Sequence, residues 1–238
     1  MTDDLTRRAA VHAALADPTR LRLVDRLVLG DLAPGELARE LGLASNLLAH
    51  HLKVLVAAGV VQRVRSEGDA RRSYVRLLLD DPLVARLLPG PDAWPSLPPV
   101  ERVVFVCTQN SARSHLAAAA FERVSTVPVA SAGTRPAARV NPTAVQVAAR
   151  HDLDLSRRVT AHVDDVLRDG DLVVSVCDAV HEELSSPAAA GQRPQVHWSV
   201  ADPVRDGAEQ AFETALTQIT ARVDRLGRAV TSSQEDRP

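Results

Sequence analysis

The stretch from Arg102 to Phe121 constrains the fold of this chain more than any other part of its sequence. It begins with an apolar run that stops at Cys107, and an alanine-rich segment with strong helix propensity starts within six residues of that cysteine. An apolar run without polar alternation is typical of a strand buried in a parallel sheet. The stretch therefore predicts a buried strand, a short loop and a helix, with Cys107 at the carboxyl end of the strand.

The loop that follows Cys107 has the chemistry of an anion-binding site. Arg113 stands after five intervening residues, so one turn of backbone can surround a tetrahedral oxyanion while the guanidinium binds two of its oxygens. The loop N–H groups and the start of the helix would also stabilise the cysteine as a thiolate. We predict that Cys107 is a nucleophile, that Ser114 adds a hydroxyl donor to its sulfur, and that the oxyanion is held by Thr108, Gln109, Asn110, Ser111, Ala112 and Arg113.

Two further candidates stand where predicted strands end. An apolar run, LVVSV, leads directly into Cys177, and Asp202 follows the last predicted strand. Ligands of parallel sheets collect at the carboxyl ends of the strands, so both residues are expected on the same edge as Cys107. Asp202 is a candidate proton donor to a departing oxygen, although an Asp-Pro pair also commonly starts a helix. A buried cysteine is often only a small apolar residue, and for Cys177 that alternative stays open.

The composition sets limits on what the chain does. Its 238 residues suit two domains, and two cysteines are too few for a disulfide framework or a structural zinc site, so we expect no metal site and no bound cofactor. No apolar run is long enough for a membrane span or a signal peptide, which predicts a cytoplasmic protein without membrane contact. A net charge of −2 excludes a globally basic nucleic-acid binder, so any DNA-binding surface must be a local patch.

Residues 1–90 predict a mainly α-helical winged helix-turn-helix domain. Asp17-Pro18 is a typical helix start, Gly42 separates two further short helices, and a polar turn separates two segments that predict a hairpin, the wing. A last helix around Leu83–Leu88 is expected to pack in a dimer. The earlier helices and the wing strands are expected at residues 18–30, 36–41, 45–57, 60–65 and 72–79.

Residues 101–230 predict an α/β domain with a four-stranded parallel sheet, because short apolar strands alternate there with helical segments. Prolines interrupt regular structure between residues 91 and 100, where we place a linker. A long helix is expected from about Gly207 to Val230, and the tail 231–238 is expected to be disordered. The predicted strands cover residues 103–106, 127–130, 172–176 and 196–198.

The first domain resembles the ArsR family of winged-helix, metalloid-responsive repressors in the segments LADPTRLRLV, ELARELGL, AHHLKVLVAAGVV and RRSYVRL. The resemblance implies a homodimer formed through this domain and a double-stranded DNA operator. The helix before the recognition helix lacks the cysteines of the family's best-known arsenite site, which argues against arsenite sensing by that route. The implied contacts, which could also form only a solvated surface, are Ser45, Asn46, His50, His51 and Lys53 in the major groove and Arg63, Arg65, Arg71 and Arg72 on phosphates.

The second domain resembles the low-molecular-weight tyrosine phosphatase superfamily, and within it the arsenate reductases, in VFVCTQNSARS, SAGTRP, NPTAV, DLVVSVCD and HWSVADP. The resemblance implies that Cys107 attacks arsenate or phosphate, that Arg113 and the loop hold the oxyanion, and that Asp202 is the general acid. Cys177 stands where thioredoxin-coupled reductases carry a resolving cysteine, but the third cysteine of those enzymes is missing. Two routes stay open: a thioredoxin-like protein directly reduces a Cys107–Cys177 disulfide, or a low-molecular-weight thiol attacks the adduct.

The two domains together predict a natural fusion of an arsenic-responsive transcriptional regulator with a thiol-dependent arsenate reductase that serves arsenic resistance. Because both cysteines lie in the second domain, that domain is expected to be the sensor. The first alternative is a tyrosine or phosphoester phosphatase tethered to DNA, and the second is a regulator whose phosphatase-like domain only senses an oxyanion. Cys177 argues against the first alternative and Asp202 against the second.

Overall fold

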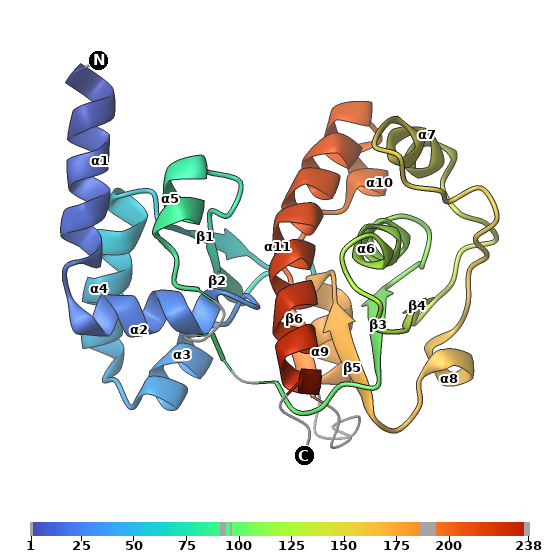
Figure 1. The fold of residues 1–238 in the computed structure, drawn as a ribbon, viewed down its shortest axis with the longest axis horizontal. Helices are drawn as coiled ribbons and strands as arrows, with labels where there is room; N and C mark the ends of the chain where they lie inside the picture. The colour runs from blue at the N-terminus through green and yellow to red at the C-terminus, as the bar shows by residue number, and fades with distance from the viewer. Residues whose placement is uncertain (1, 91–93, 96, 186–193, 236–238) are drawn as a thin grey trace. The chain divides into compact units, whose positions relative to one another are not determined.

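A computed structural model of the chain describes residues 2–90, 94–95, 97–185 and 194–235 (Figure 1). The chain divides into two compact units, one made of residues 1–66 and 70–95 and the other of residues 67–69 and 96–238. Of the predicted linker, residues 91–93 and 96 lie outside the described residues. No helix in the described part of the chain has the length and apolar character needed to cross a membrane.

The first unit is a winged helix-turn-helix domain, as predicted. Asp17 caps the second helix by accepting a hydrogen bond from the N–H of Arg20 at 2.9 Å, and Gly42 ends the third helix with a φ of 65°. These local signals allowed the helix-turn-helix to be placed from the sequence. The elements are α1 (Thr2–Leu15), α2 (Pro18–Leu27), α3 (Pro34–Leu41), α4 (Ser45–Ala57), α5 (Pro82–Leu87) and an antiparallel hairpin of β1 (Val61–Arg65) and β2 (Ser73–Leu77).

Helix α1 was not predicted from the sequence. Among its residues with described side chains, only Val11 and Ala14 are buried, so the sequence carries little apolar periodicity that could have indicated a helix. Helix α2 ends at Leu27, three residues before the predicted end near Gly30. Helix α4 begins and ends at the predicted residues.

The second unit is built on a four-stranded parallel sheet in the order β4-β3-β5-β6, as predicted. All residues of the central strand β3 after Arg102 are buried, which explains its lack of polar alternation. The sheet consists of β3 (Arg102–Cys107), β4 (Val129–Gly133), β5 (Asp171–Ser175) and β6 (Gln195–His197). Strand β4 begins two residues later than predicted and extends to Gly133.

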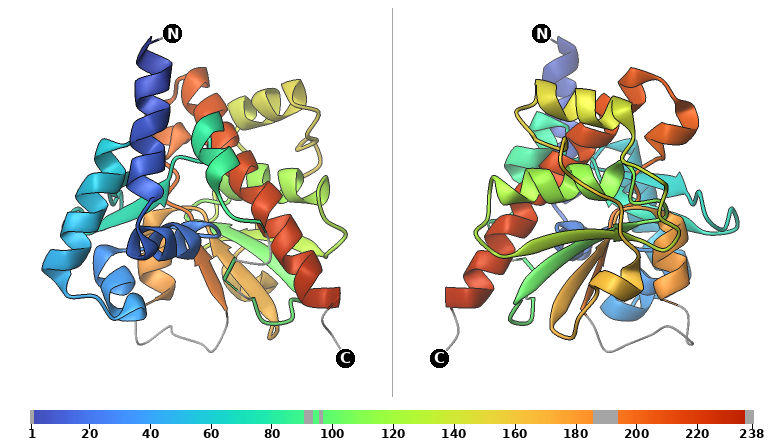
Figure 2. Two further views of the ribbon diagram at one scale, coloured as in Figure 1. Left: turned by 60° about the vertical axis from the view of Figure 1, so that its left-hand side comes forward. Right: turned by 90° about the vertical axis from the view of Figure 1, so that its right-hand side faces the viewer.

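Helices cover both faces of this sheet (Figures 1 and 2). The β3-to-β4 and β5-to-β6 connections run in opposite directions. Because parallel crossovers are right-handed, these connections place α6 (Arg113–Glu122) and α9 (Asp178–Leu184) on opposite faces. Helices α7 (Pro142–Arg150) and α11 (Glu209–Glu235) pack on the α6 side, and two short helices are α8 (Val163–Val166) and α10 (Pro203–Asp206).

Helix α11 shows that the predicted disorder is wrong for residues 231–235, which continue the helix. Val230 is fully buried, and the Thr231 hydroxyl donates to the Gly227 carbonyl at 2.9 Å, so packing and hydrogen bonding carry the helix past residue 230. The helix starts at Glu209 because Gly207 ends α10 with a φ of 80°. Its apolar face is buried as predicted, and residues 236–238 lie outside the described residues.

Candidate active site

The two cysteines lie at the carboxyl ends of adjacent strands. Cys107 ends β3, and Cys177 follows the last residue of β5 by two positions. The chain connections diverge toward the two edges of the sheet between these strands, and in such sheets the ligand crevice forms at that switch point. Each cysteine is only 2% exposed. The fold therefore gathers both thiols at the one place in the sheet where a ligand crevice is expected.

A buried network of polar side chains surrounds the sulfur of Cys107. The sulfur lies 3.1 Å from Ser114 Oγ, and Asn110 Nδ2 donates to Ser114 Oγ at 2.9 Å and to Ser131 Oγ at 3.1 Å. Asn110 Oδ1 accepts from the N–H of Ala161 at 2.8 Å, which fixes the orientation of the amide. Because the Ser114 oxygen already accepts from Asn110, its own hydrogen is free to point at the sulfur.

The backbone of the loop is held in shape by the segment 134–141. The N–H groups of Arg135, Ala137 and Asn141 donate to the carbonyls of Thr108, Gln109 and Ser111 at 2.8, 2.9 and 2.8 Å. In a trans peptide the N–H points away from the C=O, so the loop N–H groups paired with these carbonyls face the inside of the loop. Asn110, with a left-handed φ of 48°, turns the backbone at the centre. The protein's own hydrogen bonds thus hold the predicted anion loop in this shape.

Gly133, the last residue of β4, allows this close approach. A Cβ there would lie 2.8 Å from the backbone nitrogen of Asn110 and 2.8 Å from the carbonyl oxygen of Thr108. We expect Gly133→Ala to displace the loop, lower the free energy of unfolding by about 1–3 kcal/mol and reduce turnover. Thermal unfolding and activity assays measure both effects. Gly35→Ala, whose Cβ meets no atom within 4 Å, is the matched control; equal destabilisation by both changes would contradict this account.

Arg113 is a buried guanidinium at the start of α6. Its Nη1 donates to the carbonyl of Val200 at 2.9 Å, and its Nη2 lies 3.3 Å from Asp202 Oδ2. Burial opposes the charge, but the neighbouring Cys177, Cys107 and Asp202 outweigh burial and raise the pKa of Arg113 above its ordinary value. The side chain is therefore a permanent cation between the thiols and the carboxylate.

Cys177 is a buried thiol beside the loop. Its sulfur lies 3.6 Å from Thr108 Oγ1. Burial is the largest influence and raises the pKa of this thiol; the charge of Arg113 acts in the opposite direction, and that of Cys107 adds to the effect of burial. At neutral pH the Cys177 thiol is therefore protonated.

Asp202 is both a helix cap and a neighbour of the guanidinium. Its Oδ1 accepts from the N–H of Val204 at 3.2 Å at the start of α10, while its Oδ2 faces Arg113. The two interpretations of the Asp-Pro pair are thus compatible, since one oxygen caps the helix and the other points toward the site. The side chain is 27% exposed and is therefore in contact with solvent.

The other two predicted cradle residues, Gln109 and Ala112, differ in the donors that they offer. Gln109 is exposed, and its Oε1 accepts a hydrogen bond from the Ser111 hydroxyl at 3.4 Å. Ala112, the residue before α6, has no side-chain donor. Ala112 can therefore offer an oxyanion only its backbone N–H, whereas Gln109 has a side-chain amide donor in addition to its backbone N–H.

Ser131 and His115 belong to the site although the sequence pattern did not indicate them. Ser131 Oγ lies 3.0 Å from His115 Nδ1, and it also accepts from Asn110. Burial, aided by the charge of Arg158, lowers the pKa of His115 to about 4, so the ring is neutral at neutral pH. Ser131 was visible only as the first residue of the SAGTRP segment, and His115 as one helix residue among many.

Most of the predicted DNA contacts are on the surface of the first unit. The side chains are exposed on α4 at Ser45, Asn46, His50 and Lys53, and on the hairpin and its turn at Arg63, Arg65, Arg71 and Arg72. Arg63 and Arg65 also hydrogen-bond within the hairpin, to Ser73 Oγ at 2.8 Å and to the Ala70 carbonyl at 2.6 Å.

The prediction that His51 faces the major groove is wrong. Its side chain is 9% exposed, and its Nδ1 lies 3.8 Å from Asp17 Oδ1 at the start of α2. His51 is one helical turn from both Leu48 and Leu55, whose side chains are buried, so its ring points to the same inner face of α4.

Comparisons with known proteins agree with this two-part architecture. Residues 102–236 match the family described as low molecular weight phosphotyrosine protein phosphatase, and residues 15–64 match a helix-turn-helix domain. The first unit is similar to the HTH-type transcriptional regulator CmtR of Mycobacterium tuberculosis, with 40% identity over 80 residues that cover 34% of this chain and 64% of the relative. The chain spans between 45% and 64% of the length of the regulators of this kind that it matches.

The second unit is similar to the glutaredoxin arsenate reductase of Synechocystis, with 28% identity over 131 residues that cover 53% of this chain and 96% of the relative. It also matches the crystal structure of an arsenate reductase from Archaeoglobus fulgidus with 30% identity, covering 53% of this chain and 98% of that one, at a TM-score of 0.46. Since the family match extends over more than half of the sequence, this protein belongs to the low molecular weight phosphotyrosine protein phosphatase family and carries a helix-turn-helix domain ahead of the family domain.

Proposed function

We propose that this protein is an arsenate reductase joined to an arsenic-responsive DNA-binding regulator. The observation that carries the proposal is the pair of thiols at the anion loop. A hydrolytic phosphatase needs only Cys107, Arg113 and Asp202, because water completes its reaction. Reduction of arsenate takes two electrons, and Cys177 beside Thr108 offers a second thiol to supply them.

The aromatic residues of the second unit support an inorganic oxyanion over phosphotyrosine. Phe105, Phe121, Trp198 and Phe212 are each at most 1% exposed, and the chain's other phenyl, phenol and indole side chains belong to the first unit. Recognition of an aryl ring gains from packing against aromatic side chains, and this unit offers none on its surface. A small tetrahedral anion needs only the cradle and the guanidinium.

In the proposed reaction, the Cys107 thiolate attacks arsenic, and the departing hydroxyl takes a proton from Asp202 and leaves as water. The sulfur of Cys177, having lost its proton to solvent, then bonds to the sulfur of Cys107. The sulfur–arsenic bond breaks, and its electron pair stays on arsenic, which leaves as arsenite. The two thiols have lost two electrons and become a disulfide, and an external thiol reductant restores them.

The order of the two thiol steps is consistent with their electrostatics. While Cys107 carries charge, it adds to the burial that keeps Cys177 protonated. Once Cys107 is bonded to arsenic, its negative charge no longer opposes ionisation of Cys177, whereas the attraction of Arg113 remains. Cys177 is thus more readily ionised after the first step than before it.

The measurement that tests this proposal is thiol-dependent arsenate reduction beside hydrolysis of an aryl phosphate. We expect Cys177→Ser to lower arsenate reduction by at least about a hundredfold, because the internal thiol acts at a high effective concentration. Hydrolysis of the aryl phosphate should stay close to that of the wild type, since Cys107, Arg113 and Asp202 are intact.

The alternatives correspond to distinct results of that experiment. Activity of the wild type on the aryl phosphate alone would refute the reductase proposal in favour of a phosphatase. Binding of phosphate without either activity would favour an oxyanion sensor. Arsenate reduction that survives in Cys177→Ser would favour attack on the adduct by a low-molecular-weight thiol.

For the first unit we propose binding to double-stranded DNA as a homodimer, with the exposed face of α4 in the major groove and the hairpin arginines on phosphates. We expect Lys53→Ala to weaken binding to a short duplex of mixed sequence and to lower the slope of log K against log salt by about 1. Fluorescence anisotropy at several salt concentrations measures the slope. The control is Arg22→Ala, at an exposed residue of α2; an unchanged slope in Lys53→Ala, or an equal fall in both variants, would contradict the assignment of α4.

A further inference from the structure

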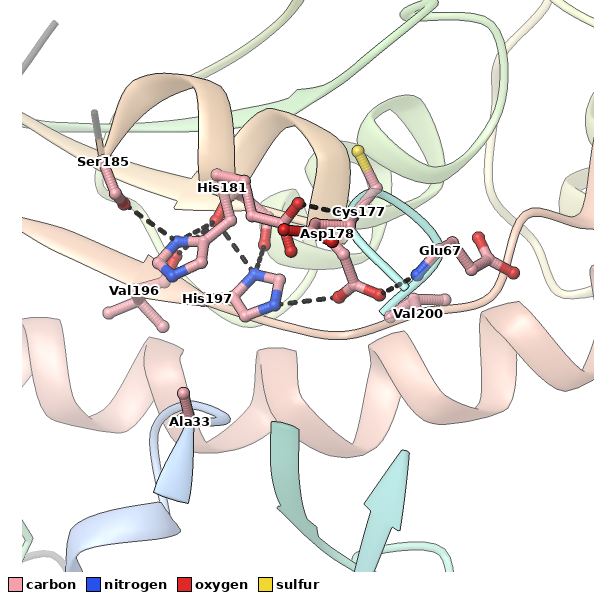
Figure 3. Close-up of polar contacts among 12 residues, drawn as sticks. Ala33, Glu67, Cys177, Asp178, His181, Ser185, Val196, His197 and Val200 are labelled. Atoms are coloured by element: carbon pink, nitrogen blue, oxygen red, sulfur yellow. Dashed lines mark hydrogen bonds and ion pairs between the residues drawn. The ribbon is translucent and has the colours of Figure 1, made fainter. Parts of the chain in front are cut away.

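A buried polar cluster lies directly behind the second thiol. Asp178, the residue after Cys177, points its carboxylate at the ring of His197, with Oδ1 3.0 Å from Nε2 (Figure 3). Both side chains are almost fully buried, at 4% and 2% exposure. The second ring nitrogen, Nδ1, lies 3.1 Å from Ser175 Oγ and 3.3 Å from the Ser175 carbonyl oxygen. Each nitrogen of His197 thus faces an acceptor, which fixes the ring and the carboxylate it holds.

The ring of His197 is also fixed by packing. His181 of α9 stacks on it with a centroid distance of 4.1 Å and an interplanar angle of 10° (Figure 3). Burial raises the pKa of Asp178, but hydrogen bonds, among them those from His197 and Ser199, outweigh it and hold the pKa below its ordinary value. The carboxylate therefore stays ionised at neutral pH and keeps its link to the ring.

The buried side chains of helix α9 lie near its start. Of its seven residues only Asp178 and Val180 are buried, whereas in α6 nine residues are. The start of α9 is also where Cys177 sits, since Cys177 is the residue before the helix and its carbonyl accepts from the N–H of His181 at 3.2 Å. A change at Asp178 is therefore a change in what holds the adjacent thiol.

His197, the partner of Asp178 in this contact, belongs to the segment that leads to the other predicted site residues. His197 ends β6, and the chain continues through Val200, whose carbonyl binds Arg113, to Asp202. The Asp178–His197 contact therefore joins the backbone of the second thiol to the segment that holds the guanidinium and the acid.

Cys177 must be well placed because a disulfide tolerates little error. The N–H of Val176 donates to the Val106 carbonyl at 2.8 Å, so Cys107 and Cys177 are nearly level on adjacent strands. Strands about 4.8 Å apart and a stagger of one residue, about 3.3 Å, give a Cα separation of about 6 Å. Disulfides form at Cα separations of about 4.4–6.8 Å, so a shift of about 1 Å that moves the start of α9 away from Cys107 leaves that window.

We propose that Asp178 and His197 are positioning residues that hold Cys177 at disulfide distance from Cys107. The role in turnover rests on the proposed arsenate reduction, but the placement of the thiol does not. In this role Asp178 and His197 act through the backbone of Cys177 and not by direct contact with either sulfur.

The test is the equilibrium between the Cys107–Cys177 disulfide and a dithiothreitol redox buffer, in which oxidised dithiothreitol takes two electrons and two protons from the protein thiols. Acid quenching, alkylation and mass measurement give the oxidised fraction. We expect Asp178→Asn and His197→Gln each to lower the equilibrium constant for closure about tenfold, a shift of about 30 mV to less negative potential. The double variant should lower the constant by less than the product of the two single effects, because the two residues share one contact.

Controls separate positioning from general damage. Glu183→Gln removes another acid from α9, one that is half exposed and 3.8 Å from Arg135, and should leave the potential unchanged. Aryl phosphate hydrolysis, where the wild type shows it, should persist in Glu183→Gln, because this change leaves the segment that holds Arg113 and Asp202 in place. If one variant does not fold, as judged by thermal unfolding, the other still tests its own half of the pair.

Three results would overturn the inference: no intramolecular disulfide in the wild type, unchanged potentials in both single variants, or an equal shift in Glu183→Gln. Failure of the proposed function would give a different experimental result. A wild type that closes the disulfide with the expected dependence on Asp178 and His197, yet reduces no arsenate, would refute arsenate reduction and support the positioning role.

Discussion

Replacing Cys107 with serine is expected to lower both arsenate reduction and aryl phosphate hydrolysis by at least about a thousandfold. In the proposed mechanism both reactions begin with attack by the sulfur of Cys107, which ends β3, and a serine hydroxyl is a much weaker nucleophile. The serine oxygen would keep the contact with Ser114 Oγ, which lies 3.1 Å from the sulfur, without supplying the nucleophile. Steady-state turnover of the two substrates measures the loss.

The comparison with Cys177→Ser distinguishes loss of the nucleophile from loss of the second thiol. Cys107→Ser should remove both activities, whereas Cys177→Ser should remove one. Binding of phosphate, measured by calorimetry, should survive in Cys107→Ser, because the cradle hydrogen bonds from segment 134–141 do not involve the sulfur. Residual turnover of either substrate within about tenfold of the wild type would show that another nucleophile acts, and would refute the assignment of the loop.

Replacing Arg113 with lysine is expected to reduce both activities by about a hundredfold to a thousandfold. The charge is kept, but the planar fork that reaches Val200 with one nitrogen and faces Asp202 with another is lost. An ammonium cannot bind two oxygens of a tetrahedral anion while it holds the segment that carries the acid. Turnover and phosphate affinity, measured on the same preparation, report the two roles.

The matched control is Arg205→Lys on α10, an exposed arginine in the same segment of the chain. It should change neither turnover nor affinity. If Arg113→Lys retained full activity, the geometry of the guanidinium would be irrelevant, and a simple positive charge would be enough.

The parts of this site that could be predicted are those encoded by residues close together in the sequence. The apolar run into Cys107, the spacing to Arg113 and the alanine-rich helix are all local, and each reflects the burial of one element. The carboxyl-end rule then extended the prediction to Cys177 and Asp202, since it needs only the strands and their direction.

The parts that could not be predicted depend on contacts between distant segments. The three hydrogen bonds from residues 134–141 to the loop, and the contact between Asp178 and His197, join residues whose proximity only the complete fold determines. His51 was assigned to the wrong side of α4 because the sequence alone does not distinguish it from the adjacent His50. In a helix, successive side chains point about 100° apart. The helical continuation to residue 235 depends on packing around Val230, which composition does not report.

The loop shape set by segment 134–141 has a consequence for selectivity. Because the protein's own hydrogen bonds form the cradle, phosphate and arsenate, which share shape and charge, should occupy it with similar ease. For the proposed reductase, phosphate is then expected to be a competitive inhibitor, and the occupancy of the loop should follow the ratio of the two anions. Discrimination would come after binding, since thiols reduce arsenic but not phosphorus. Selectivity in the proposed reaction would therefore lie in the electron-transfer step and not in the affinity of the loop.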